Sequence, residues 1–265
     1  MTPIVPADRD LKTFAGLRKV IATLRAPDGC PWDRVQTHQT LRPFLLEETA
    51  EVIAAIDEAD ADALCEELGD VLFNVLLHTQ LAEESGDFKM ADVIYAVAAK
   101  LVRRHPHVFA DSDADTPAAV VAQWDDLKTK ERGAQPTLAN IPAALPALAY
   151  AQAVQRRVAR AGFAWESGAQ AWDALDEELR ELRTAATPEE QRQELGDAIF
   201  ALANLGRQLD IDAEDALRSA SRSFSRRYNA MEGLLHQRGI DLKTTDIDTK
   251  LALWEEAKAS TGGRP

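Results

Sequence analysis

The stretch LLEETAEVIAAI, residues 45–56, combines the apolar spacing of an amphipathic helix with two acidic residues beside its apolar side. Leu45, Val52 and Ile56 fall at helical spacing and predict a stripe that faces a core. Glu48 lies on this stripe, and Glu51 follows three residues later. A buried carboxylate is costly unless a partner or a metal compensates its charge. The segment therefore predicts a helix that carries acids into the interior of a bundle.

The same helical spacing runs through most of the 265 residues and predicts an all-α fold. Abundant Ala and Leu, with few aromatic residues, favour helices as well. No stretch shows the alternation of apolar and polar residues that is typical of a strand. We expect helices at 14–26, 41–58, 61–84, 90–104, 117–130, 146–160, 169–185, 188–209, 213–238 and 248–258.

Charge and composition exclude several classes of function. A net charge of −14 argues against broad binding to nucleic acid or anionic membranes, because either would need a basic face. No apolar run approaches the ~20 residues of a membrane span, and the first residues contain no apolar signal-peptide core. Cys30 and Cys65 fit neither a disulfide framework nor a CxxC metal site. We therefore expect a cytoplasmic protein with reduced thiols and neither a membrane nor a nucleic-acid partner.

The two halves of the chain repeat the same motifs in the same order, which predicts a duplicated helical unit. The expected layout is an N-terminal helical domain at 1–131, a Pro-containing linker at 132–146 and a C-terminal helical domain at 147–265. In the first half the motifs are EETAE (47–51), EELGD (66–70) and KLVRRH (100–105). In the second half they are DEELRE (176–181), QELGD (193–197) and SFSRRY (223–228).

Each half contains two pairs of acids, and the members of a pair lie three residues apart on one helix face. Antiparallel packing of the two acid-bearing helices would bring four carboxylates together, and their repulsion requires protonation or bound cations. Ligand sets made only of oxygen suit Mg²⁺ or Mn²⁺ better than Zn²⁺. The predicted metal ligands are Glu178, Glu181, Glu194 and Asp197, with a second set at Glu48, Glu51, Glu67 and Asp70.

Basic residues follow the acids in both halves and predict phosphate binding. Arginine and lysine side chains are the donors that phosphates need, and metals held by carboxylates complete their shells with phosphate oxygens. A polyphosphate site follows, in which a metal-activated water attacks phosphorus. The candidates are Arg226 and Arg227 in the second half and Lys100, Arg103 and Arg104 in the first. Asn204 lies two turns after Asp197 on the acid stripe, where the first half has Leu77.

Taken together, these segments resemble the MazG family within the all-α nucleoside triphosphate pyrophosphohydrolases. A lone ExxE motif is weak evidence for this family, whereas an ordered set of motifs that covers nearly the whole chain is specific for it. The segments that carry the resemblance are GCPWD (29–33), EETAEV (47–52), EELGDVLF (66–73), RRHPHVFAD (103–111), GFAW (162–165), EELRE (177–181) and ELGDAIF (194–200).

The resemblance implies a homodimer of tandem helical domains that needs Mg²⁺. It implies hydrolysis of nucleoside triphosphates between the α and β phosphorus, which yields nucleoside monophosphate and pyrophosphate, with the C-terminal domain as the reactive one. Residues carried over by position have four roles. Glu178, Glu181, Glu194 and Asp197 would hold metal, Glu177 would orient or deprotonate water, Arg226 and Arg227 would contact phosphates, and Trp254 would stack on the base.

One residue departs from the family pattern. The phosphate-binding stretch of the family usually begins with Lys, but Ser223 occupies this place in SFSRR, whereas the first half keeps Lys100. We favour the C-terminal site because only this copy has Asn204 on its acid stripe. Two alternatives stay open: a narrower dUTPase or dCTPase of the same fold, and a non-catalytic helical interaction module with a degenerate site.

Overall fold

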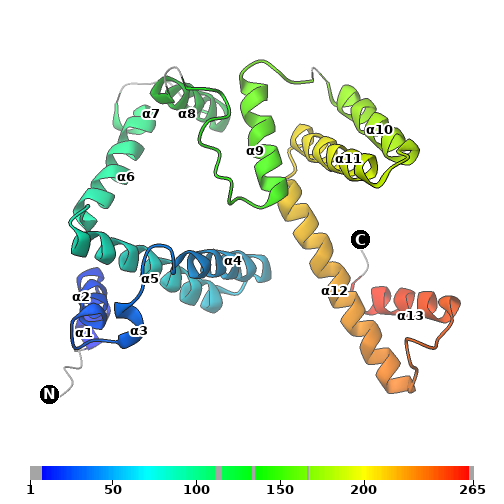
Figure 1. Ribbon diagram of the computed structural model, residues 1–265, viewed down its shortest axis with the longest axis horizontal. Coiled ribbons are helices and arrows are strands. Elements are labelled where there is room, and N and C mark those ends of the chain that lie inside the picture. Colours follow the sequence, from blue (N-terminus) through cyan, green and yellow to red (C-terminus); the bar gives the residue numbers. More distant parts are fainter. Residues whose placement is uncertain (1–7, 111–114, 133–134, 166, 263–265) are drawn as a thin grey trace. The chain divides into compact units, whose positions relative to one another are not determined.

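The computed structural model describes residues 8–110, 115–132, 135–165 and 167–262, and these ranges contain thirteen helices and no strand (Figure 1). The predicted all-α fold is therefore confirmed. The chain divides into two compact units, Met1–Arg132 and Gly133–Pro265. Residues 133–134 of the predicted linker lie outside the described ranges, and residues 135–146 form turns and extended chain.

The first unit contains eight helices, and the second contains five. In the first unit they are α1 (Asp8–Leu11), α2 (Phe14–Arg25), α3 (Pro31–Arg34), α4 (Arg42–Glu58), α5 (Ala61–Ser85), α6 (Met90–Arg104), α7 (Pro106–Phe109) and α8 (Pro117–Arg132). In the second they are α9 (Ala147–Arg160), α10 (Gly168–Thr184), α11 (Pro188–Gln208), α12 (Ala213–Arg238) and α13 (Ile247–Ser260). Every long helix begins and ends within two residues of its predicted limits.

Each unit is built on an antiparallel helical hairpin, α4–α5 in the first and α10–α11 in the second (Figure 1). Ala59 and Asp60 connect α4 to α5. Ala59 is left-handed at φ 54°, and the Asp60 carboxylate accepts from two backbone N–H groups at 3.0 Å to cap α5. The α10–α11 connection ends at Thr187, which forms a capping box with Glu190. Such short connections require antiparallel neighbours, so the predicted packing of the acid-bearing helices is confirmed.

The cores lie beside these hairpins. In the first unit the buried cluster joins α2, α5 and the start of α6, and it contains Ile21, Leu41, Leu76, Leu77 and Met90. The second unit has one cluster between α10 and α11, with Ala171, Leu175 and Leu205, and another between α12 and α13, with Met231, Leu235, Leu253 and Ala257. In addition, α2 packs against α5 and α9 packs against α11, so each hairpin is held by a further helix of its own unit.

The other side of each hairpin is exposed, and this corrects the expectation that the acids lie inside a bundle. Ile56 is 57% exposed although its spacing predicts a core position. Glu51 and Asp70 are exposed, and Glu48 is only partly buried. The physical reason is that no described helix of the first unit packs over this face of α4 and α5, so its apolar stripe stays exposed within that unit.

Candidate active site

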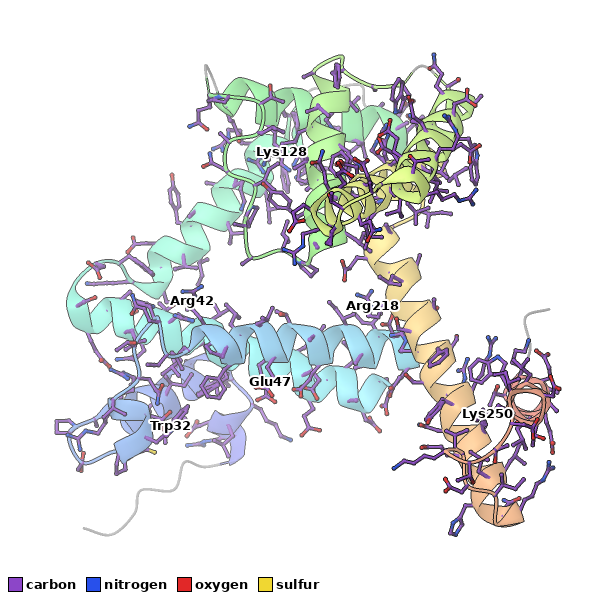
Figure 2. All side chains as sticks on the ribbon, turned by 45° about the vertical axis from the view of Figure 1, so that its right-hand side comes forward. Trp32, Arg42, Glu47, Lys128, Arg218 and Lys250 are labelled. Atoms are coloured by element: carbon purple, nitrogen blue, oxygen red, sulfur yellow. The ribbon has the colours of Figure 1, made fainter. Side chains whose placement is uncertain are left out.

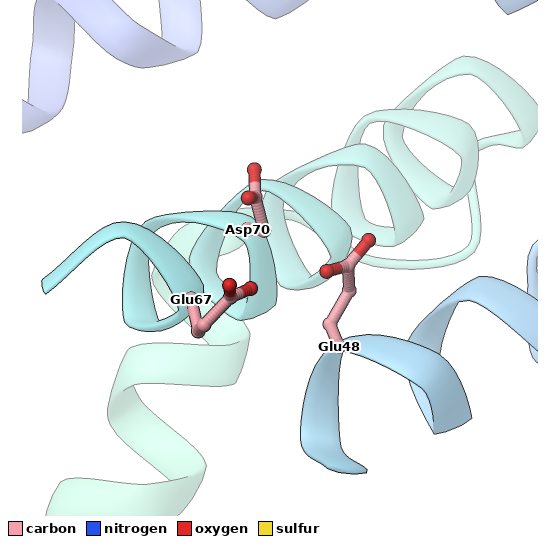
Figure 3. A group of neighbouring side chains, drawn as sticks. All are labelled: Glu48, Glu67 and Asp70. Atoms are coloured by element: carbon pink, nitrogen blue, oxygen red, sulfur yellow. The ribbon is translucent and has the colours of Figure 1, made fainter. Parts of the chain in front are cut away.

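Three carboxylates meet in the first hairpin, where Glu48 of α4 faces Glu67 and Asp70 of α5 (Figure 3). One carboxylate oxygen from each residue lies within 4.8 Å of the other two. Partial burial, and then neighbouring acids that include Glu51, raise the pKa values of Glu48 and Glu67. The hairpin therefore brings together all four acids of the N-terminal set.

The second hairpin repeats this arrangement with Glu178 of α10 and Glu194 and Asp197 of α11, whose oxygens also lie within 4.8 Å of one another. Glu181 lies beside Glu194, and both line the same small surface recess. Glu177 is exposed beside the cluster. In both hairpins the glutamates of the triad are partly buried and the aspartate is exposed, so the duplication in sequence is also a duplication of geometry.

In both clusters the surroundings disfavour the ionised form of two glutamates, whose pKa values are raised. Partial burial, and then the negative charge of Asp197, raise the pKa of Glu178 above its ordinary value. Partial burial and the charge of Glu181 raise the pKa of Glu194 in the same direction. A cation held between these oxygens would remove the repulsion. Because the donors are carboxylates alone, without His or Cys, they fit a hard divalent ion.

A pocket of about 340 Å³ adjoins the C-terminal acids. Its walls come from α9, the α9–α10 connection, α10 and α11, and they include Phe163, Trp165, Glu178, Asp197 and Phe200. The aromatic side chains make one part of the pocket apolar, and the two acids make another part polar. A volume of this size is typical of sites for small organic ligands.

Trp165 and Phe163 were not predicted as site residues, although GFAW is one of the segments that carry the family resemblance. The first half has Trp32 at the corresponding place, on α3 (Figure 2). Its ring lies edge-on to that of Phe44 of α4, at 5.6 Å between ring centroids. An exposed Trp that recurs beside an acid hairpin in both halves was the signal that could have identified Trp165.

One side of α11 runs the length of the pocket. Asp197, Phe200, Asn204 and Arg207 are three or four residues apart, so they follow one face of the helix, and all four line the pocket. The predicted position of Asn204 on the acid stripe agrees with this geometry. Since a helix rises about 1.5 Å per residue, Asp197 and Arg207 mark opposite ends roughly 15 Å apart.

The cationic candidates of the second unit lie on α12, outside the residues that line this pocket. Arg226 is exposed, and its guanidinium approaches Ser223 Oγ at 3.5 Å. Arg227 is half-buried, and its Nε is shielded without a hydrogen-bond partner. Trp254 of α13 packs against Phe224 of α12 at 5.1 Å between ring centroids. The structure thus does not bring these residues to the acids within one chain.

The arginines of the first unit already have acidic partners. Arg103 and Arg104 bind the Glu131 carboxylate at 2.7 and 2.6 Å. These two hydrogen-bonded guanidinium groups lower the pKa of Glu131 to about 2. Lys100 is exposed on α6. The N-terminal acids therefore lack the two free arginines that the sequence suggested.

The model of the MazG nucleotide pyrophosphohydrolase domain matches residues 36–109, which contain the first acid hairpin. This match, together with the all-α fold and the acid clusters, places the chain in the all-α class of nucleotide pyrophosphohydrolases. The chain is 42% identical over 247 residues to the nucleoside triphosphate pyrophosphohydrolase/pyrophosphatase MazG of Thermotoga maritima, a match that covers 92% of this chain and 95% of that protein. It is 41% identical over 251 residues to the nucleoside triphosphate pyrophosphohydrolase of Escherichia coli, covering 91% and 95%.

The chain belongs to the MazG family of nucleoside triphosphate pyrophosphohydrolases. It is thus a hydrolase that acts on phosphoric anhydrides, and its acid clusters offer ligands for a divalent metal. Among the described helices, none has the length and apolar character that crossing a membrane requires.

Proposed function

We propose that the C-terminal acid cluster and the adjoining pocket form the active site, which uses Mg²⁺ to convert nucleoside triphosphates into nucleoside monophosphate and pyrophosphate. The observation that carries the proposal is the pocket itself: Glu178 and Asp197 line it together with aromatic side chains. One site then accommodates the phosphates at its acidic end and the nucleoside along α11.

The residues have distinct roles in this proposal. Glu178, Glu181, Glu194 and Asp197 would hold Mg²⁺, for which Mn²⁺ could substitute. When bound, these ions would neutralise the charge of the acids and bind phosphate oxygens. They would also lower the pKa of a water molecule bound to the metal. Glu177 accepts a proton from the attacking water or orients it, because it is exposed directly beside the cluster. The attack is on the α phosphorus, and pyrophosphate leaves with the electron pair of the broken P–O bond.

Two features favour the C-terminal half over the N-terminal half. The arginines after the N-terminal acids are bound to Glu131. Leu77, the counterpart of Asn204, is fully buried in the core and presents no polar group. The N-terminal hairpin, with Glu48, Glu51, Glu67 and Asp70, then serves mainly as structure. The domain limits of 1–131 and 147–265, and a cytoplasmic location, stay predictions.

Product analysis tests the reaction. Incubation with ATP, GTP, CTP, UTP, dUTP or dCTP and Mg²⁺ should yield monophosphate and pyrophosphate in equal amounts, with no nucleoside diphosphate. Chromatography of the nucleotides and a coupled pyrophosphate assay measure both products. Formation of diphosphate and orthophosphate would contradict attack at the α phosphorus. Turnover of dUTP or dCTP alone would support the narrower alternative.

We also propose that the protein is a homodimer, because both acid-bearing hairpins present matching exposed stripes. Leu68, Leu72 and Val75 follow the first acids of α5, and Leu195, Ile199 and Leu202 occupy the same spacing on α11. Leu195 and Leu202 are 50% and 55% exposed. A second copy would bury these stripes and thereby place the acids inside a larger bundle, where the sequence predicts them.

Arg226, Arg227 and Trp254 would then reach an acid cluster in the assembled dimer.

Charge placed in this stripe should dissociate the dimer. The double substitution Leu195→Glu and Leu202→Glu puts two unpaired carboxylates into the apolar contact, so we expect a monomer and dimerisation weakened at least about 100-fold. Sedimentation equilibrium measures the mass, with the exposed Gln193→Glu as the matched control on the same helix. A wild-type protein that sediments as a monomer at micromolar concentration would overturn the proposal.

A further inference from the structure

Two histidines of the first unit face each other, His38 from the turn before α4 and His78 from α5. Their Nδ1 atoms lie 2.8 Å apart, which is a hydrogen-bond distance. The two rings are parallel to within 1°, and their centroids are 5.1 Å apart. This is the largest centroid separation that the short contact between the Nδ1 atoms allows, so the rings lie head to head in one plane. The contact is therefore a hydrogen bond between two imidazoles and not a stack of two ring faces.

A hydrogen bond of this kind needs one proton between the two nitrogens, which makes it sensitive to pH. A neutral imidazole has one donor and one acceptor nitrogen, whereas both nitrogens of an imidazolium donate. A neutral pair is joined when one ring carries its proton on Nδ1 and the other carries it on Nε2. A first added proton goes to Nε2 of the donor ring and strengthens the bond, because the donor then carries a charge. A second must go to Nδ1 of the acceptor ring, and it replaces the bond by two cations that face each other.

Burial distinguishes the two rings. His38 is exposed, whereas His78 is partly buried on α5. Burial first, and then the charge of His38, lower the pKa of His78 below its ordinary value. His38 is therefore the donor that takes up the first proton, and His78 is the acceptor that resists the second.

His38 is the charged group that acts on His78, since the lowered pKa has no other charged cause among the described residues. Several charged groups on α5 and on the helices packed against it are exposed or have partners of their own. They include Arg42 at the start of α4, the acid cluster of α4 and α5, Arg18 and Arg25 of α2 with their partners Glu83 and Glu84 at 2.7 Å, and Asp92 of α6, which accepts from the Lys89 N–H at 2.8 Å.

The histidine pair holds the turn that leads into α4. Within this turn the Thr37 N–H donates to Thr40 Oγ1 at 2.9 Å, and the Thr40 N–H donates to Thr37 Oγ1 at 3.2 Å, so the turn is closed locally. The buried Leu41 and the bond between His38 and His78 join it to α5. Directly after Leu41 comes α4, whose N-terminus has no side-chain cap. Loss of the histidine bond therefore weakens the attachment of the helix that carries two of the N-terminal acids.

We propose that His38 and His78 form a proton-operated clamp, which holds the start of α4 against α5 at neutral pH and releases it when both imidazoles are protonated. The clamp acts within the first unit and is independent of the proposed C-terminal active site.

The direction of the pH dependence follows from the lowered pKa of His78. The clamp contributes stability above the ordinary pKa of histidine, and this contribution is lost as the pH falls through the lowered value. The raised pKa values of Glu48 and Glu67 in the same unit act in the opposite direction, because their favourable contribution is lost as the pH rises. A comparison of variants at one pH removes this background.

Long-range ¹H–¹⁵N NMR of the histidine side chains in the full-length wild type tests the bond itself. At about pH 7.5 we expect a coupling between the Nδ1 nuclei of His38 and His78, with His78 in the Nε2–H tautomer, and we expect the coupling to vanish below about pH 5. His236, which is exposed on α12, should show no such coupling at either pH.

Hydrogen exchange tests whether the bond acts as a clamp. The backbone N–H groups of Leu41 and Leu45 donate to the carbonyls of Thr37 and Leu41 at 3.2 and 3.1 Å, so they report on the turn and on the start of α4. In His38→Ala their exchange should be about fivefold faster than in the wild type at about pH 7.5, and within about twofold of it at about pH 5. The matched control His236→Ala should leave both rates within about twofold at either pH.

Absence of the Nδ1 coupling in the wild type at about pH 7.5 would overturn the inference, and this measurement does not require a variant to fold. Equal acceleration of exchange in His38→Ala at both pH values would also overturn it, because that pattern indicates packing that is independent of protons. Pyrophosphate release is not used in either experiment, so failure of the proposed function leaves both results interpretable.

Discussion

Replacing Glu178 and Glu181 together by Gln should abolish Mg²⁺-dependent pyrophosphate release, with kcat/KM lowered roughly 1,000-fold or more. Glu178 is a member of the C-terminal carboxylate triad, and Glu181 lies beside Glu194 of that triad. Neutral amides of the same shape retain the packing and lose the charge that a divalent cation needs. A coupled pyrophosphate assay at several Mg²⁺ concentrations measures the loss.

The chain contains its own matched control, because Glu48→Gln with Glu51→Gln makes the same change in the N-terminal cluster. We expect this variant to stay within about threefold of the wild type, since the N-terminal arginines are bound to Glu131. The reverse pattern, with activity lost only in the N-terminal variant, would move the active site to the first hairpin.

Loss of folding does not explain the expected result for the C-terminal pair. The folded-state pKa of Glu178 is raised, so its favourable contribution is complete below the ordinary carboxyl pKa and is lost as pH rises through the raised value. A neutral Gln avoids that loss. In EDTA at pH 8 the variant should therefore unfold at a temperature at least equal to that of the wild type, and the difference should vanish near pH 4. Mg²⁺ should raise the unfolding temperature of the wild type more than that of the variant, which keeps only the N-terminal acid cluster.

The second large effect should come from the double substitution Arg226→Ala and Arg227→Ala, which we expect to lower kcat/KM roughly 100-fold. Arg226 is exposed, so its guanidinium can donate to phosphate oxygens, and the half-buried Arg227 has an Nε without a hydrogen-bond partner. Steady-state kinetics with ATP measure the change, and most of it should fall on KM if the arginines act by binding the triphosphate.

Arg218→Ala is the control on the same helix (Figure 2). Arg218 pairs with Asp215 at 2.7 Å across one turn of α12, an arrangement that contributes little to stability, so its loss should change kcat/KM by less than twofold. Ser223→Lys should act in the opposite direction from the arginine substitutions and lower KM about threefold, because it restores the cation that the family pattern has at this place. Activity retained without Arg226 and Arg227 would separate α12 from the phosphate site.

The helices were predictable because their signals are local. Apolar spacing, a capping residue such as Thr187 and a left-handed end such as Gly239 all act within a few residues of one another. The single-turn helices α1, α3 and α7 were not predicted, since one turn has no periodicity to detect. The pairing of the two acid hairpins followed from the repeat, because a duplicated sequence folds into duplicated geometry.

Burial was predicted wrongly for a physical reason. An apolar stripe looks the same in sequence whether its own chain or another molecule covers it, so the spacing of Ile56 predicts a core residue although it is exposed in the single chain. The pocket was missed for a related reason. Trp165 and Gln155 reach it from α9 and the following connection, and no local spacing links them to Asp197.

Crystals grown with Mn²⁺ and a non-hydrolysable nucleoside triphosphate test most directly whether carboxylates of α10 and α11 hold divalent cations against the substrate. Anomalous scattering at the manganese edge should give a peak among the oxygens of Glu178, Glu194 and Asp197, with the triphosphate beside it and the base in the pocket along α11. A nucleotide bound elsewhere on the protein, or acids without an anomalous peak between them, would contradict this mechanism.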